Sequence, residues 1–223
     1  MSTINLISLL ETDVWGAHTS LLAEFRKWRH YGLFFRALTT LNVGALYQSR
    51  LHGQGHIERT LLLAALLAWR ENLSAEDTDS LLLAAAYHDV GRVDDSYDTE
   101  HGTRSAERLG DLTGRTGQEL LLLQGAVAAH SRPDHLLEET VAGYGYVNFP
   151  HAVELAQLLK DADGLDRVRI RDLNPNFLRH ESARFFPPFA EYLFDLYCRI
   201  GAASAAYWCP TKKRIVSIET GTA

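Results

Sequence analysis

Hydrophobic positions recur at helical spacing along most of the chain. Apolar residues three and four positions apart mark one face of a helix, and a segment that is apolar all round marks a buried helix. His56–Glu71 is of the second kind. Alternating strand patterns are scarce, and the one weak example is Arg214–Ile218. The pattern therefore predicts an all-α protein.

Capping residues, glycines and prolines divide the expected helices. Ser74 followed by Asp77 resembles a capping box and opens a helix that ends near Gly91. Gly114 and Arg132-Pro133 each stop a helix. The other expected helices are one capped by Thr12 or Asp13, then Ala17–His30, Glu107–Leu112, Gln118–His130, His151–Leu159 and Phe189–Trp208, the last ended by Pro210.

The length of 223 residues suits one large domain. We expect N-terminal helices in residues 1–50 to pack on a helical domain at 51–209, followed by a C-terminal tail at 210–223. The stretch Arg132–Pro150 is long for a connection in a helical bundle, so we interpret it as a candidate lid over a site.

Composition narrows the class of protein. Hydrophobic residues make up 46% and charged residues 22%, which excludes a disordered or collagen-like chain. The net charge of −6 argues against a duplex nucleic-acid partner, although it allows one small basic pocket. The two cysteines, Cys198 and Cys209, are too few for a disulfide framework and indicate a reducing compartment.

Membrane and targeting signals are not expected. The longest apolar runs, Leu61–Trp69 and Leu81–Tyr87, are shorter than the roughly 18 residues of a membrane span. The first residues lack the basic region and cleavage site of a signal peptide. We therefore expect a cytoplasmic protein without a membrane partner.

Ten histidines are unusual, and several lie with aspartates at predicted helix ends. A bundle can bring such ends together, and imidazole and carboxylate are ligands of borderline divalent metals. The candidates in chain order are His56, His88, Asp89, His101, His130, Asp161 and Asp163. Asp161 and Asp163 lie about 200° apart on a helix, so only one of them should face a shared site.

The order His56, His88-Asp89 and Asp163 resembles the HD superfamily of metal-dependent phosphohydrolases. The sequences around them, HIERT, AAYHDVGR and LLKDADGLDRV, match as well, and the likeness covers roughly residues 50–170. The resemblance implies a single HD-type helical bundle that holds one or two divalent metals. It implies those four residues as ligands of the first metal, with Asp89 bridging to a second metal bound by His101 and His130.

Departures from the family pattern bear on the substrate. No GYP signature is present, so the chain does not resemble the cyclic-di-GMP subgroup. Arg92 stands where some 5′-nucleotidase members have glutamate, which argues against that substrate class. The segments HDVGRVDDSYD, DRVR and LNPNFLR are similar to the phosphodiesterase domains of SidE-type effectors, which act on ADP-ribosylated protein.

Phosphate ester hydrolysis needs a nucleophile and groups that offset negative charge. A metal lowers the pKa of bound water, and the planar guanidinium of arginine suits phosphate. Arg59, Arg92 and Arg167 each follow a predicted ligand closely, so we interpret them as catalytic phosphate contacts. Asp94, with Asp95 and Asp98 nearby, is the candidate general acid or partner of a ligand histidine.

Each of these residues also has an ordinary structural interpretation. Asp163 and Arg167 can form a surface ion pair at i,i+4 spacing, and Arg92 can pair with Asp94 or Asp95. Arg59 can pair with Glu58 or Asp89. His101 can be a solvated loop residue and His130 a helix-end residue. We assign four other histidines to the surface or the lid, namely His52, His135, His151 and His180.

Three functions remain open. The leading one is a metal-dependent phosphohydrolase acting on a small phosphorylated, nucleotide-like substrate, either a mono- or a diester. The second keeps the site but takes an ADP-ribosyl or phosphoribosyl diester. The third is a binding module without turnover. The metal can be Mn, Fe, Co, Ni, Zn or Mg, with one or two ions per chain, and the oligomeric state stays open.

Overall fold

The computed structural model describes residues 6–201, and all regular secondary structure in that range is helical. The predicted all-α class is confirmed there. The α-helices are α1 (Leu6–Leu10), α2 (Thr19–Phe25), α3 (Tyr31–Thr39), α4 (Gln54–Arg70), α5 (Ala75–Tyr87), α6 (His101–Thr113), α7 (Gly117–His130), α8 (Leu137–Ala142), α9 (Phe149–Leu165) and α10 (Pro187–Gly201). Arg214–Ile218, Cys209, the helix end at Trp208 to Pro210 and the tail at 210–223 lie outside the described residues.

Local capping signals account for several helix boundaries. The Ser74 hydroxyl accepts a hydrogen bond from the backbone N–H of Asp77 at 3.0 Å, so the predicted cap of α5 is confirmed. Gly114 ends α6 in the left-handed conformation, with φ at 67°. Asn148 caps α9, and Pro150 lies in its first turn.

Three boundaries differ from the expectation. Thr12 follows α1 and donates its hydroxyl hydrogen to the carbonyl of Leu9, so it does not open a helix. Residues 17–30 are not one helix, because α2 ends at Phe25 and a turn leads into α3. Helix α6 begins at His101, six residues before the expected start.

The missed first turns of α6 have a packing reason. A Cβ on Gly102 would lie 2.6 Å from the Ser131 hydroxyl and from the Val127 carbonyl, so only glycine lets α6 approach α7 this closely. The first turn of α6 contains a glycine and polar residues and has no apolar stripe, so hydrophobic periodicity does not predict it.

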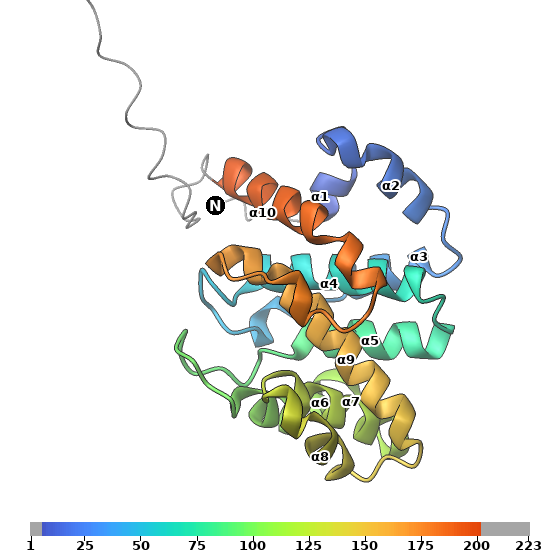
Figure 1. Cartoon of the computed structure of the whole chain (residues 1–223), viewed down its shortest axis with the longest axis vertical. Coiled ribbons are helices and arrows are strands. Elements are labelled where there is room, and N and C mark those ends of the chain that lie inside the picture. The colour runs from blue at the N-terminus through green and yellow to red at the C-terminus, as the bar shows by residue number, and fades with distance from the viewer. Residues whose placement is uncertain (1–5, 202–223) are drawn as a thin grey trace, which may run out of the picture.

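Helices α4 and α9 form the centre of the molecule (Figure 1). Every residue from His56 to Ala68 of α4 is buried, as its all-round apolar pattern predicts. Helix α4 packs against α3, α5 and α9, and α7 packs against α6, α8 and α9. Helix α10 lies along the side of α4 away from α6–α8 (Figure 1). This packing directs the ends of α4, α5, α6, α7 and α9 toward one region.

The stretch Arg132–Pro150 is not a free lid. It contains α8, whose Leu137 and Val141 are buried against α7 and α9. Removing these side chains from water anchors the segment to the bundle. The helices within residues 6–201 do not include one that is long and apolar enough to cross a membrane.

Candidate metal centre

The six residues expected to bind metal lie together in the structure. Each comes from the end of a helix, where a side chain can point past its own helix into the space between neighbours. They are His56 in the first turn of α4, His88 and Asp89 directly after α5, His101 at the start of α6, His130 at the end of α7 and Asp163 in the last turn of α9. A Cβ on Gly91 would lie 2.4 Å from the Ser105 nitrogen, so this glycine allows the chain after Asp89 to contact α6.

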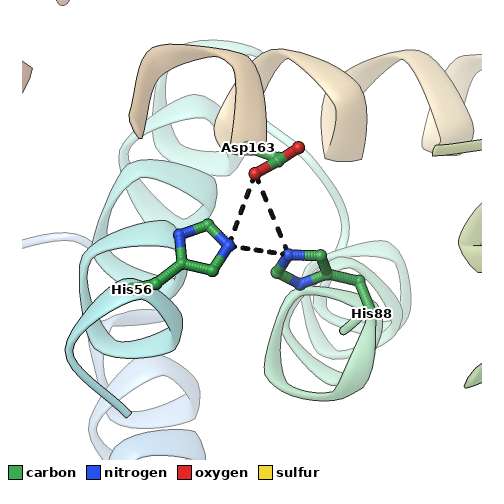
Figure 2. A group of neighbouring side chains, drawn as sticks. All are labelled: His56, His88 and Asp163. Atoms are coloured by element: carbon green, nitrogen blue, oxygen red, sulfur yellow. Dashed lines mark hydrogen bonds and ion pairs between the residues drawn. The ribbon is translucent and has the colours of Figure 1, made fainter. Parts of the chain in front are cut away.

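The first group of ligand atoms joins α4, α5 and α9. Nε2 of His56 lies 3.0 Å from Nε2 of His88. Oδ1 of Asp163 lies 3.4 Å from the first nitrogen and 3.9 Å from the second. Figure 2 shows the three side chains pointing toward one another from their separate helices.

Asp89 connects this group to a second one. Its Oδ2 lies 3.5 Å from Nε2 of His56 and 3.8 Å from Nε2 of His88. Its Oδ1 lies 3.1 Å from Nε2 of His101 and 3.7 Å from Nε2 of His130. The last two nitrogens are 3.0 Å apart. One carboxylate thus lies within 3.8 Å of all four imidazoles and connects the two groups of candidate ligands.

The other ring nitrogens fix the orientation and tautomer of the histidines. Nδ1 of His56 donates to Asp166 at 2.8 Å, and Nδ1 of His88 donates to the Ala85 carbonyl at 2.9 Å. Nδ1 of His101 and of His130 also donates to a backbone carbonyl. A neutral imidazole that donates through Nδ1 carries a lone pair on Nε2, so all four lone pairs face the shared space.

This donor set fits a divalent metal. Two nitrogen lone pairs at 3.0 Å repel one another unless a cation lies between them. Oδ2 of Asp89 and Oδ1 of Asp163 are buried at the same place, and neither accepts a hydrogen bond within the described part of the chain. Buried carboxylate oxygens without donors are costly, and a bound cation removes that cost. Imidazole and carboxylate are ligands that borderline divalent metals accept.

Burial and neighbouring charges keep the ligands in the metal-binding protonation state. Burial lowers the pKa of His56 to about 3 and that of His130 to about 4, so both rings are neutral at pH 7. Burial would raise the pKa of Asp163, but the nearby positive charge of Arg169 overcomes this effect and lowers that pKa.

The metal-free protein should lose stability in mild acid. The pKa values of His56 and His130 are near 6.5 in the unfolded chain and lower in the folded one, so below pH 6.5 the unfolded chain binds more protons. The free energy of unfolding should fall by about 2 kcal/mol for each histidine between pH 7 and pH 5. Urea unfolding of chelator-treated protein measures this. The exposed-site variant His135→Gln should follow the same curve, and a flat profile over this range would contradict the prediction.

Arg59 is placed differently from the expectation. It is 2% exposed, and its Nε and Nη2 donate to the two carboxylate oxygens of Asp166 at 2.6 and 2.8 Å. Its guanidinium also lies over the rings of Phe194 and Tyr197. The expectation that Arg59 contacts a substrate phosphate is therefore wrong, because these donors already bind a buried carboxylate. The carboxylate that it hydrogen-bonds is thus Asp166, and its charge also acts to lower the pKa of the neighbouring Glu58.

Arg92 and Arg167 lie nearer to solvent. Nε of Arg92 donates to Oδ1 of Asp89 at 2.9 Å, so Arg92 hydrogen-bonds a candidate ligand and not Asp94 or Asp95. Arg167 forms an exposed ion pair with Asp172 and none with Asp163 among the described residues. Both arginines therefore stay candidates for contact with a substrate.

Asp94 does not fit the role of general acid. It is exposed, and the hydroxyl and backbone N–H of Ser96 donate to its carboxylate. These hydrogen bonds lower the pKa of Asp94, so the group is ionised at neutral pH and has no proton to give. The expectation that Asp94 acts as general acid is therefore wrong, because its carboxyl group is already deprotonated.

The two aspartates near the end of α9 serve different sites, as their helical spacing predicts. Asp163 faces the metal centre, whereas Asp161 is fully buried and accepts hydrogen bonds from the backbone N–H groups of Arg179 and His180. His180 also bridges Asp161 and Glu154, so it anchors the loop and is not a free surface residue.

Sequence reasoning missed several buried groups around the centre. His52 is 6% exposed and not at the surface, since its Nδ1 lies 2.9 Å from Asp95 and its ring packs edge-on against His56. Asp166 and Arg169, just after α9, are also buried. The sequence signal for these two residues is the charged run DRVR, which directly follows an apolar helix.

A cleft of about 340 Å³ opens beside the metal centre. His130 and Asp163 form part of its wall, so the cleft reaches two candidate ligands. Its basic side chains are Arg132, Lys160, Arg167 and Arg179. Tyr97 and Phe177 also line it and are largely exposed. His151 pairs with Asp77 on another face, and His135 is exposed.

The comparisons with known proteins bear on the same segment. The family model of the HD domain matches residues 53–168, just over half of the chain, and this range includes all six candidate ligands. The comparisons with curated proteins and with solved structures found no match. The resemblance drawn from the motifs is confirmed by the family model. The chain therefore belongs to the HD domain family.

Proposed function

We propose that this protein is a metal-dependent phosphohydrolase that acts on a nucleotide-like phosphate mono- or diester. The HD domain marks a superfamily of metal-dependent hydrolases. The observation that carries the proposal is the convergence of four imidazole lone pairs and two carboxylate oxygens that accept no hydrogen bond from the described residues. This group lies next to a cleft that four basic side chains help to line.

The chain's own residues organise the reaction site. His56, His88, Asp89 and Asp163 would hold one divalent ion, and Asp89 with His101 and His130 a second. Such ions supply a water of lowered pKa and offset the charge of the phosphoryl group. Asp166 and the backbone carbonyls fix the imidazoles, which reduces the reorganisation needed when substrate binds.

The cleft supports a phosphorylated substrate. The exposed pair between Arg167 and Asp172 contributes about 0–1 kcal/mol, so a phosphate can replace Asp172 at little cost. Lys160 donates to the backbone carbonyls of Ala129, His130 and Arg132, which keeps its charge at the wall of the cleft. The exposed rings of Tyr97 and Phe177 offer surfaces on which a nucleobase can stack.

A substrate screen on metal-loaded protein tests the proposal. The panel contains nucleoside phosphates, ADP-ribose, ADP-ribosylated protein and a chromogenic phosphodiester, each with Mn, Co, Ni, Zn, Mg and Fe(II). We expect turnover that depends on the metal and stops with chelator. A clear preference for ADP-ribosylated protein would favour the ADP-ribosyl diester alternative. Full metal content with nucleotide binding but no turnover would favour a binding module instead.

A further inference from the structure

Arg169 lies against the metal centre, and two of its nitrogens have no hydrogen-bonded partner among residues 6–201. It belongs to the 3₁₀ helix Asp166–Ile170 that continues α9, and only 5% of the residue is exposed. Its Nη1 is 3.6 Å from Oδ1 of Asp163 and 3.7 Å from Oδ2 of Asp166. These distances allow electrostatic attraction but exceed those of hydrogen bonds.

The unfilled donors are unusual for a buried arginine. Nε and Nη1 of Arg169 are buried and find no acceptor in the part of the chain that the structure describes. Leaving such donors unsatisfied costs free energy, more so for a charged group. The nearby Arg59 shows the ordinary solution, because its Nε and Nη2 are both bound to Asp166.

A second unsatisfied group, of opposite charge, lies close to Arg169. Oδ1 of Asp163 accepts no hydrogen bond, although Arg169 is the closest guanidinium among the described ion pairs of that oxygen. If the two residues formed only a structural pair, a direct hydrogen bond would satisfy both. A metal at Asp163 and an anion at Arg169 satisfy them together.

We propose that Arg169 binds a phosphoryl oxygen of the substrate on the Asp163 side of the metal centre. The inference rests on the proposed function, because it takes the anion to be a phosphate. Arg92 is less suited to this role, since its Nε already donates to the ligand Asp89. The guanidinium of Arg169 offers several donors and a positive charge beside Asp163, and both suit a phosphoryl oxygen.

Binding of inorganic phosphate to the metal-loaded protein tests the inference without relying on turnover. Isothermal titration would compare the wild type with Arg169→Gln, Arg169→Lys and the control Arg36→Gln. Arg36 is exposed and pairs with the half-buried Asp79 near the start of α5, far along that helix from His88. We expect Arg169→Gln to weaken phosphate binding about tenfold or more, Arg169→Lys to lie between, and Arg36→Gln to match the wild type.

Metal content and melting temperature separate substrate binding from a structural role. We expect both to stay near wild-type values in the Arg169 variants. If Arg169→Gln loses metal or unfolds, the phosphate titration of Arg169→Lys replaces it as the test. Weaker phosphate binding by Arg169→Lys at full metal content supports the inference. Loss of metal in both variants would show that Arg169 serves only to support Asp163, and would overturn it.

Two further outcomes would also overturn the inference. One is phosphate affinity within twofold of wild type in Arg169→Gln, and the other is a wild-type protein that binds no phosphate at millimolar concentration. Neither outcome touches the proposed function, which depends on turnover in the substrate screen. Conversely, Arg169-dependent phosphate binding without turnover on any ester would leave the anion site standing and refute the phosphohydrolase.

Discussion

Replacing Asp89 by asparagine should remove most of the bound metal and lower kcat/KM by about a thousandfold or more. The carboxylate of Asp89 contacts Nε2 of all four histidines in the centre. Asparagine keeps the shape of the side chain but removes the negative charge and one of the two ligand oxygens. Elemental analysis of purified protein and steady-state kinetics on the best substrate of the screen measure the two effects.

A matched variant controls for the chemical change itself. Asp111→Asn makes the same substitution at an exposed position of α6, and we expect wild-type metal content and activity. The Asp89→Asn protein should also remain folded, because asparagine has nearly the same size as aspartate and leaves the apolar packing unchanged. Full metal content together with activity within tenfold of wild type would refute the shared-ligand role of Asp89.

Asp166→Asn should lower the free energy of unfolding by about 3–5 kcal/mol. Asp166 is 1% exposed and neutralises the buried Arg59 through two hydrogen bonds. Burial would raise the pKa of Asp166, yet Arg59 and His56 lower it to about 2, so the pair is ionic at neutral pH. Asparagine leaves the guanidinium of Arg59 buried without its counter-charge. Urea unfolding of the wild type and the variant measures the loss.

The exposed pair between Arg167 and Asp172 provides the control. Asp172→Asn breaks a pair of the same chemical type in water and should cost about 0–1 kcal/mol. Asp166→Asn should in addition weaken metal binding about 10–100-fold, because Asp166 also orients His56 through Nδ1. A destabilisation no larger than that of Asp172→Asn would contradict the assignment of a buried ion pair.

Local patterns in the sequence determined the helical class and most of the candidate metal ligands. The apolar run of α4, the Ser74 cap of α5 and the glycine that ends α6 act within a few residues of themselves, so their effect is visible in the chain. The same is true of Asp161 and Asp163, whose spacing on one helix placed them on different faces. The order and surroundings of the histidines carried the family likeness that the family model confirms.

The tertiary structure decided which arginines face the site and which hold it together. Arg59 lies one helical turn after His56, and nothing near it in the chain shows that its partner is Asp166, 107 positions away. The burial of His52 and Arg169 likewise depends on how α4, α9 and the segment after α9 pack. An arginine has the same charge whether it pairs with a buried carboxylate or awaits an anion. Only the positions of the acceptors around it distinguish the two, and folding brings those acceptors from distant parts of the chain.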